Sequence, residues 1–144
     1  MKVEIKVSAD IKEPYAVLYT NDITDDIQKI SAFLQSQERV ITANDEGRII
    51  ILKPEEIFMV RIEESEAVIY CKNKQYMTNK KLYELEEQLG KGFLRISKAS
   101  IVNLKLIDCV EPSFNGMMLL IMKNGCKDYI SRKYLPEFKK YLGI

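Results

Sequence analysis

The sequence predicts a mainly β protein with short helices, and three observations support this fold class. Short apolar or alternating segments recur between residues 40 and 131, separated by turn residues. Asn124-Gly125 lies between two of these segments, and Asn-Gly is a strong signal for a β-hairpin. Helical spacing of apolar residues occurs only over short stretches. At 144 residues, we expect one main domain with a short appended segment.

The first 42 residues are predicted to form a small β-β-α extension. Residues 2–7 alternate charged and apolar side chains, and residues 16–19 are a second short strand candidate. Thr24 is a good N-cap, and apolar residues at helical spacing then predict a helix to about residue 37. We expect this extension to serve dimerisation or regulation.

Residues 43–144 are predicted to form the main domain, built from hairpins. Its expected strands, the first of which begins just before this boundary, are residues 40–43, 48–52, 57–62, 67–71, 75–78, 93–96, 106–110, 117–122 and 126–131. Its expected helices are residues 81–89, which Gly90 ends, and residues 136–142. We also expect Ser97 to cap a short helical turn that contains Ile101 and Val102.

Composition excludes much catalytic chemistry. The chain has no histidine, which removes Ser-His and Cys-His nucleophile pairs and histidine metal ligands. The glutamates at positions 55, 56, 84, 86 and 87 are expected to be solvated surface residues. We therefore expect no enzyme, no catalytic residue, no cofactor, no metal and no small-molecule substrate.

The three cysteines and the hydropathy pattern indicate a cytoplasmic protein. Cys71, Cys109 and Cys126 lack C-x-x-C spacing and are expected to be reduced thiols. The N-terminus has no signal-peptide core, and no apolar run approaches the roughly 20 residues of a membrane helix.

The net charge of +1 conceals an asymmetry between the two parts of the chain. Residues 91–144 carry ten basic against four acidic side chains, whereas residues 1–90 carry twelve basic against seventeen. An asymmetry of this size indicates a polyanion-binding end. Affinity for DNA comes largely from such cations, which neutralise phosphates and release counterions.

Three motifs in the basic part carry a family resemblance. They are F-L-R-I-S-K-A-S-I-V-N from Phe93, I-D-C-V-E-P-S-F-N-G from Ile107, and N-G-x-x-x-Y-I-S-R-K-Y from Asn124. In this order and spacing, the chain resembles the LytTR-type DNA-binding domain of bacterial transcription regulators. The resemblance covers about residues 46–144 and implies an elongated, LytTR-like β-sandwich whose loops enter successive major grooves. The family's receiver domain is missing from these residues, so the chain resembles the stand-alone variety.

The first predicted contact region follows the strand at residues 93–96. The resemblance implies that Lys98 reads a base. Ser97 and Ser100 are expected to support a phosphate, because a helix N-terminus would present free backbone N–H groups there. Arg95 is expected to contact either a phosphate or an intramolecular carboxylate.

The second predicted region is the corner at residues 131–134. The resemblance implies a base-reading cation here, which Lys133 matches best. Arg132 would fork onto a phosphate or a guanine, since both present paired acceptors. Lys105 is a further phosphate candidate.

A third family contact falls in the loop after Arg61, where this sequence departs from the family pattern. Glu63, Glu64 and Glu66 would repel phosphates, so this loop either stays outside the groove or uses a carboxylate to accept from cytosine N4. Arg61 either supports DNA or pairs with one of these glutamates.

These observations predict a sequence-specific DNA-binding transcription regulator that acts on double-stranded DNA, at tandem repeats. A homodimer and a small membrane-protein regulator are the candidate protein partners, the second only because the resemblance implies it. The acidic loop motivates an alternative: a LytTR-like interaction module that sequesters a related regulator.

Overall fold

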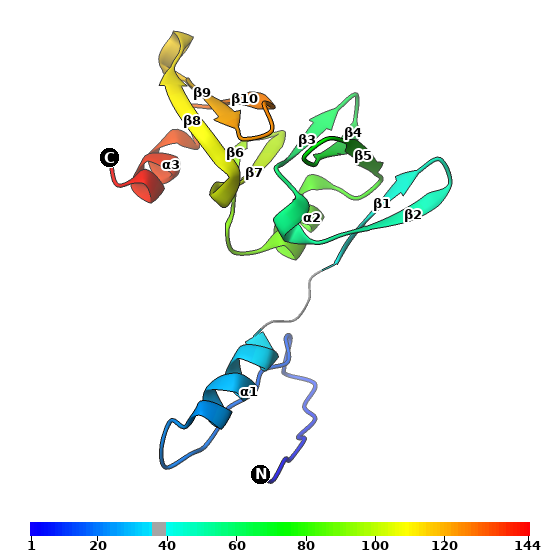
Figure 1. Ribbon diagram of the computed structural model, residues 1–144, viewed down its shortest axis with the longest axis vertical. Helices are drawn as coiled ribbons and strands as arrows, with labels where there is room; N and C mark the ends of the chain where they lie inside the picture. The colour runs from blue at the N-terminus through cyan, green and yellow to red at the C-terminus, as the bar shows by residue number, and fades with distance from the viewer. Residues whose placement is uncertain (36–39) are drawn as a thin grey trace. The chain divides into compact units, whose positions relative to one another are not determined.

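The computed structural model describes residues 1–35 and 40–144, and the chain divides into two compact units, residues 1–37 and 38–144 (Figure 1). Among the described residues, no helix has the length and apolar content needed to cross a membrane.

The first unit contains one helix, α1 (Asp25–Gln35). Its predicted N-cap is confirmed, because Thr24 Oγ1 accepts from the Ile27 N–H at 3.3 Å. The two predicted strands are wrong: residues 1–24 form turns and coil, and Ile5 is 87% exposed. Alternation alone does not make a strand, because a strand also needs a neighbour for its backbone groups. The predicted end of the helix near residue 37 lies outside the described residues.

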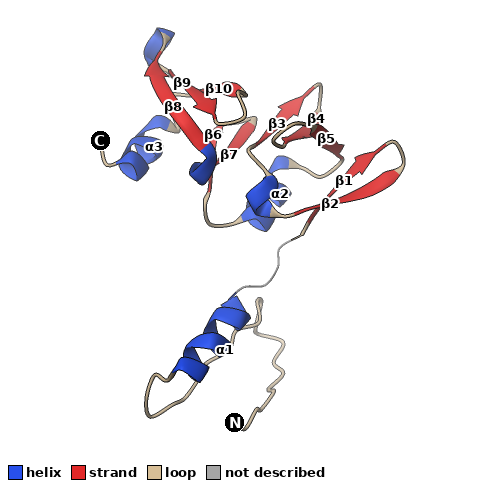
Figure 2. Cartoon of the chain, in the orientation of Figure 1, coloured by secondary structure: helices blue, strands red, loops and turns tan. Residues whose placement is uncertain are grey.

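The second unit begins with a seven-stranded antiparallel sheet in the order β2-β1-β5-β4-β3-β7-β6 (Figure 2). Its strands are β1 (Ile41–Asp45), β2 (Arg48–Leu52), β3 (Met59–Glu63), β4 (Glu66–Tyr70), β5 (Gln75–Thr78), β6 (Phe93–Ser97) and β7 (Ser100–Asn103). Helix α2 (Leu82–Leu89) connects β5 to β6 and ends at Gly90, which has φ 65°.

A second, three-stranded sheet follows in the order β10-β9-β8. It contains β8 (Ile107–Pro112), β9 (Met118–Met122) and β10 (Lys127–Ile130), and α3 (Leu135–Leu142) ends the chain. The mainly β fold with short helices is therefore confirmed, and the hairpin around Asn124-Gly125 joins β9 to β10.

The seven-stranded sheet is buried on both faces at β3 and β7, because successive side chains point to opposite faces. Val60 and Ile101 pack with the α2 leucines on one face. Met59 and Val102 pack on the other face with the second sheet and with Phe138 of α3. All four strand side chains are 0% exposed. These two cores hold the loops at the strand ends in fixed positions.

The predicted helical turn after Ser97 is wrong. Residues 98–99 form a turn, and Ser100 starts β7, where Ile101 and Val102 pair with β3 and β6. Both side chains are β-branched and therefore suit a strand, and their burial on the two faces of the sheet outweighs the local helical signal. No helix N-terminus is therefore present at this turn.

Candidate nucleic-acid interface

Three loops from distant parts of the sequence meet at one end of the second unit. The Ile62 N–H donates to the carbonyl oxygen of Ala99 at 2.8 Å, which joins the end of β3 to the β6–β7 turn. The Ser131 N–H donates to the carbonyl oxygen of Ile96 at 2.9 Å, which joins the end of β6 to the segment after β10. The β3–β4 turn, the β6–β7 turn and the corner at residues 131–134 are therefore neighbours.

The β6–β7 turn presents Lys98 to solvent. Ser97 Oγ accepts from the Ala99 N–H at 3.1 Å, which closes the turn from within. The carbonyl oxygen of Lys98 accepts from Arg95 Nη1 at 3.5 Å, while the Lys98 side chain is exposed. Ser97 therefore shapes this turn, and Lys98 is its outward cation.

The corner between β10 and α3 presents two adjacent cations, Arg132 and Lys133, both exposed. The carbonyl oxygen of Ser131 accepts from the N–H groups of Tyr134 and Leu135, each at 3.0 Å, so the corner is internally bonded. Lys133 Nζ lies 5.5 Å from the centroid of the Tyr134 ring, a cation–π contact that orients the lysine.

The loop between β8 and β9 supports Arg132. Gly116 has φ 73°, and a Cβ at this position would lie 3.4 Å from Arg132 Cδ. Only glycine adopts this conformation without strain. The F-N-G part of the sequence motif therefore provides a surface against which the Arg132 side chain packs.

A polar network lies beneath these loops and involves Arg61. Arg61 Nη2 donates to Glu63 Oε1 at 2.6 Å and to the Tyr70 hydroxyl at 2.9 Å. Its Nη1 donates to the carbonyl oxygen of Lys127 at 3.1 Å and lies 3.8 Å from Asp128 Oδ2. Asp128 Oδ2 also accepts from the Ser100 hydroxyl. The network thus links β3, β4, β7 and β10.

The network also shifts pKa values. The hydrogen bond from Tyr70, followed by the bond from Arg61, lowers the pKa of Glu63 against the opposing effect of burial. Burial and the bond to Glu63 raise the pKa of Tyr70. Burial opposes charge on Arg61, but its hydrogen bonds to Glu63 and Tyr70 outweigh that effect and raise its pKa. Glu63 and Arg61 therefore remain an ion pair at neutral pH.

Four of the predicted contact residues lie away from the exposed loop surface. Arg61 is in the network, and Ser100 is 0% exposed with its hydroxyl on Asp128. Arg95 Nη2 forms an ion pair with Glu86 Oε2 at 3.0 Å, the intramolecular alternative for this residue. Lys105 is exposed but follows the far end of β7, away from the turn that holds Lys98. Of the predicted cations among the described residues, Lys98, Arg132 and Lys133 are exposed on these neighbouring loops, and Ser97 lies in the Lys98 turn.

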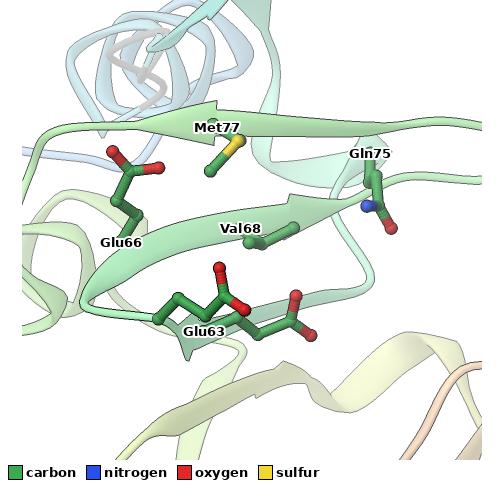
Figure 3. A pocket seen from close by; sticks show the side chains of 6 residues that line it. Glu63, Glu66, Val68, Gln75 and Met77 are labelled. Atoms are coloured by element: carbon green, nitrogen blue, oxygen red, sulfur yellow. The ribbon is translucent and has the colours of Figure 1, made fainter.

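The acidic loop borders an open groove. Glu63 forms the ion pair with Arg61 and also lines this groove, together with Glu64, Glu66, Val68, Gln75 and Met77 (Figure 3). Within residues 1–35 and 40–144, no ion pair joins Glu64 or Glu66 to the three exposed cations. The cations of the two loops are therefore not neutralised by direct contact with these glutamates.

Sequence reasoning missed the structural part played by Asp128 and Tyr70. The signal for Asp128 is its place in β10, where this acidic residue shares a strand face with the buried Ile130 two positions later. It also missed an aromatic pair beside the interface: Phe114 and Tyr129 pack edge to face at 5.4 Å, although Phe114 is 58% exposed.

Comparison with known proteins places this geometry in a family. The model of the LytTr DNA-binding domain matches residues 47–143. The LytTr DNA-binding domain of a protein described as a methyl-accepting/DNA response regulator from Bacillus cereus has a similar fold. The TM-score is 0.68, with 24% identity, over 74% of this chain and 98% of that domain.

Two relatives illustrate the range of lengths. The sensory transduction protein LytT of Enterococcus faecalis is 31% identical over 109 residues, and this chain spans 45% of its length. A protein described as an uncharacterized HTH-type transcriptional regulator of Staphylococcus aureus is 26% identical over 146 residues, which cover 100% of this chain and 99% of that protein. In the described residues of this chain, no two α-helices follow each other directly, because strands lie between α1 and α2 and between α2 and α3. The matched residues, the β topology and the neighbouring basic loops lead to one conclusion: this chain belongs to the LytTR DNA-binding domain family.

Proposed function

We propose that this protein is a sequence-specific DNA-binding transcription regulator that reads major grooves through loops of its β fold. The observation that carries the proposal is the Ser131–Ile96 backbone bond, since it holds the Lys98 turn beside the corner of Arg132 and Lys133. Two adjacent loops whose exposed cations form no ion pair within the described residues suit a polyanion with grooves.

Lys98 and Lys133 are assigned to base edges, where a lysine donates to the acceptors of guanine. Arg132 is assigned to a phosphate, which its guanidinium binds through two parallel hydrogen bonds. Ser97 shapes the Lys98 turn, and Ser100 and Arg61 fix the strands behind it. No cofactor is needed for this chemistry.

The protein is proposed to act in the cytoplasm, with two copies on tandem repeats. If a protein–protein contact or the DNA itself links the two copies, binding of the first raises the effective concentration of the second and so the overall affinity. The extension at residues 1–42 is proposed to serve dimerisation or regulation, and a small membrane protein is the proposed regulator.

The first test is selection of binding sites from random duplex DNA by the full chain at two salt concentrations. We expect enrichment of a paired repeat, and binding that weakens steeply with salt because phosphate contacts release counterions. Uniform weak binding to all sequences, with no enriched site, would reject sequence-specific regulation.

The open groove beside β5 favours a second candidate, a protein-interaction module. Glu64 and Glu66 are exposed there next to Met77, which is 45% exposed. A related regulator with a basic apolar surface would fit this groove. Glu64→Lys combined with Glu66→Lys is the discriminating variant: it should strengthen binding to DNA under the first proposal and abolish capture of a regulator under the second.

A further inference from the structure

The outer edge of the seven-stranded sheet is formed by β2, whose sequence is Arg-Ile-Ile-Ile-Leu. In the described residues, β2 pairs with β1 on one side and with no strand on the other. Ile49 is 77% exposed and Ile51 is 67% exposed. An apolar strand edge of this kind is a template for another strand.

The hairpin geometry determines which backbone groups point outward. The β1–β2 turn consists of Glu46 with φ 50° and Gly47 with φ 81°, values typical of a two-residue type I′ turn. Asp45 and Arg48 close this turn and form backbone hydrogen bonds to each other. In an antiparallel pair, every second residue of β2 then forms backbone hydrogen bonds to β1. The N–H and C=O groups of Ile49 and Ile51 therefore point away from β1.

The usual protections of a strand edge are missing from this segment. Proteins blunt exposed edges with lysine, proline, inward charges or bulges. Residues 49–51 are all isoleucine, and the β1–β2 register is continuous from Ile41↔Leu52 to Asp45↔Arg48. A lysine and a proline occur only after the strand, at Lys53 and Pro54.

We propose that β2 is a self-association edge, at which β2 of a second copy pairs antiparallel about a two-fold axis through Ile50. In this register, Ile49 of each copy lies opposite Ile51 of the other, and their outward N–H and C=O groups form reciprocal hydrogen bonds. The isoleucine side chains of these pairs gather on one face, as favourable cross-strand neighbours. The apolar segment is symmetric about Ile50, which suits a two-fold pair.

The charges at the ends of the paired strands also favour a second copy as the occupant. In the same register, Gly47 lies opposite Lys53 of the second copy, so Glu46 is one position from that lysine. Both side chains are exposed. The two-fold axis repeats this pair of opposite charges at the other end of the interface.

This interface is separate from the proposed DNA surface. The other outer strand of the sheet is β6, and five strands lie between it and β2. The proposed dimer forms in solution without DNA. Its two-fold axis makes the two copies point in opposite directions, whereas two copies bound to tandem repeats would point in the same direction. A single strand pair buries less than the roughly 800 Å² per partner of a standard interface, so association is expected to be weak, on the order of micromolar.

Sedimentation velocity of the full chain without DNA tests the proposal, over concentrations from about 1 to 300 µM, a range chosen around micromolar affinity. We expect a reversible shift from monomer to dimer. Ile51→Pro removes an outward N–H but no bond to β1, and should weaken the dimer at least about 10-fold, since proline is tolerated only on strand edges. Ile49→Lys provides a second disruption at an exposed position and should have the same effect.

Tyr83→Lys is the matched control, because Tyr83 is also a large exposed side chain but lies on helix α2. It should leave the dimer constant unchanged. A chain that remains monomeric over the whole range would overturn the proposal, as would a dimer that Tyr83→Lys disrupts while Ile51→Pro and Ile49→Lys do not. Circular dichroism confirms that each variant is folded, and no measurement depends on DNA.

Discussion

The backbone N–H of Ser131 lies 2.9 Å from the carbonyl oxygen of Ile96, and this single bond joins two loops that are more than thirty residues apart in the sequence. Lys98 follows Ile96 by two positions and Lys133 follows Ser131 by two, so the bond makes the loops that carry these lysines neighbours at the sheet end. Backbone groups set this spacing, so side-chain substitutions at the lysines should alter DNA contacts without altering the scaffold.

Lys98→Ala and Lys133→Ala are each expected to relax base preference at one operator position, by about 1 to 3 kcal/mol. The lost lysine would no longer donate to its base, whereas the phosphate contacts would remain. Binding to the selected site and to all its single-base variants measures the change. Lys105→Ala is the matched control, an exposed lysine at the far end of β7. An equal loss on every sequence would instead assign the two lysines to phosphates.

Asp128→Ala is expected to destabilise the fold by about 1 to 3 kcal/mol, because it leaves the buried Ser100 hydroxyl without its acceptor. Urea unfolding measures this loss. Asp108→Ala removes an exposed carboxylate from β8 and should change stability by less than about 0.5 kcal/mol. If the two variants were equally stable, the polar network would have no structural part in holding the loops.

Gly116→Ala is expected to lower both stability and affinity for DNA. Alanine at φ 73° costs about 1 kcal/mol, and its Cβ would lie 3.4 Å from Arg132 Cδ, which restricts that side chain. Gly125→Ala is the control, since Gly125 has φ 88° but nothing within 4 Å of its Cβ position. Both variants should lose similar stability, and only Gly116→Ala should bind DNA more weakly after correction for the folded fraction. Equal affinities would remove Arg132 from the interface.

Glu63 is expected to make stability depend on pH in the acid range. The hydrogen bond from Tyr70 and then the bond from Arg61 hold its pKa below the ordinary value of 4.5. A carboxylate with a lowered pKa in the folded state stabilises the protein above its ordinary pKa, and that contribution is lost as pH falls through the lowered value. Glu63→Gln should therefore flatten the stability curve below about pH 4.5, with a loss near neutral pH of only about 0.5 to 1.5 kcal/mol because the side chain is partly solvated. Thermal unfolding from pH 2 to 7 measures both, and Glu64→Gln, at an exposed neighbour, is the matched control.

Local patterns predicted most of the hairpins because their signals lie within a few residues. Asn124-Gly125 marks the β9–β10 turn, and Gly47 has the positive φ that the β1–β2 turn requires. The leucine stripe of α2 and the cap at Thr24 are likewise local. The boundary of the extension at residue 42, its function and the identity of the base-reading lysines stay predictions.

The errors occurred where partners from elsewhere in the chain decide the conformation. Residues 2–7 have strand alternation but form coil, while Ile101 and Val102 were predicted to be helical and form β7. For Arg61 and Arg95 the sequence left two alternatives open, contact with DNA or with an intramolecular carboxylate, and Glu63 and Glu86 bind them in the folded chain.

The sequence by itself determined the fold class, the turns and the concentration of basic residues after position 90, since each depends on residue type and short spacing. Only the tertiary structure decided which cations remain exposed together. That choice depends on backbone bonds such as Ser131 to Ile96 and on buried acceptors such as Asp128. These contacts join residues far apart in the chain, and no local pattern encodes them.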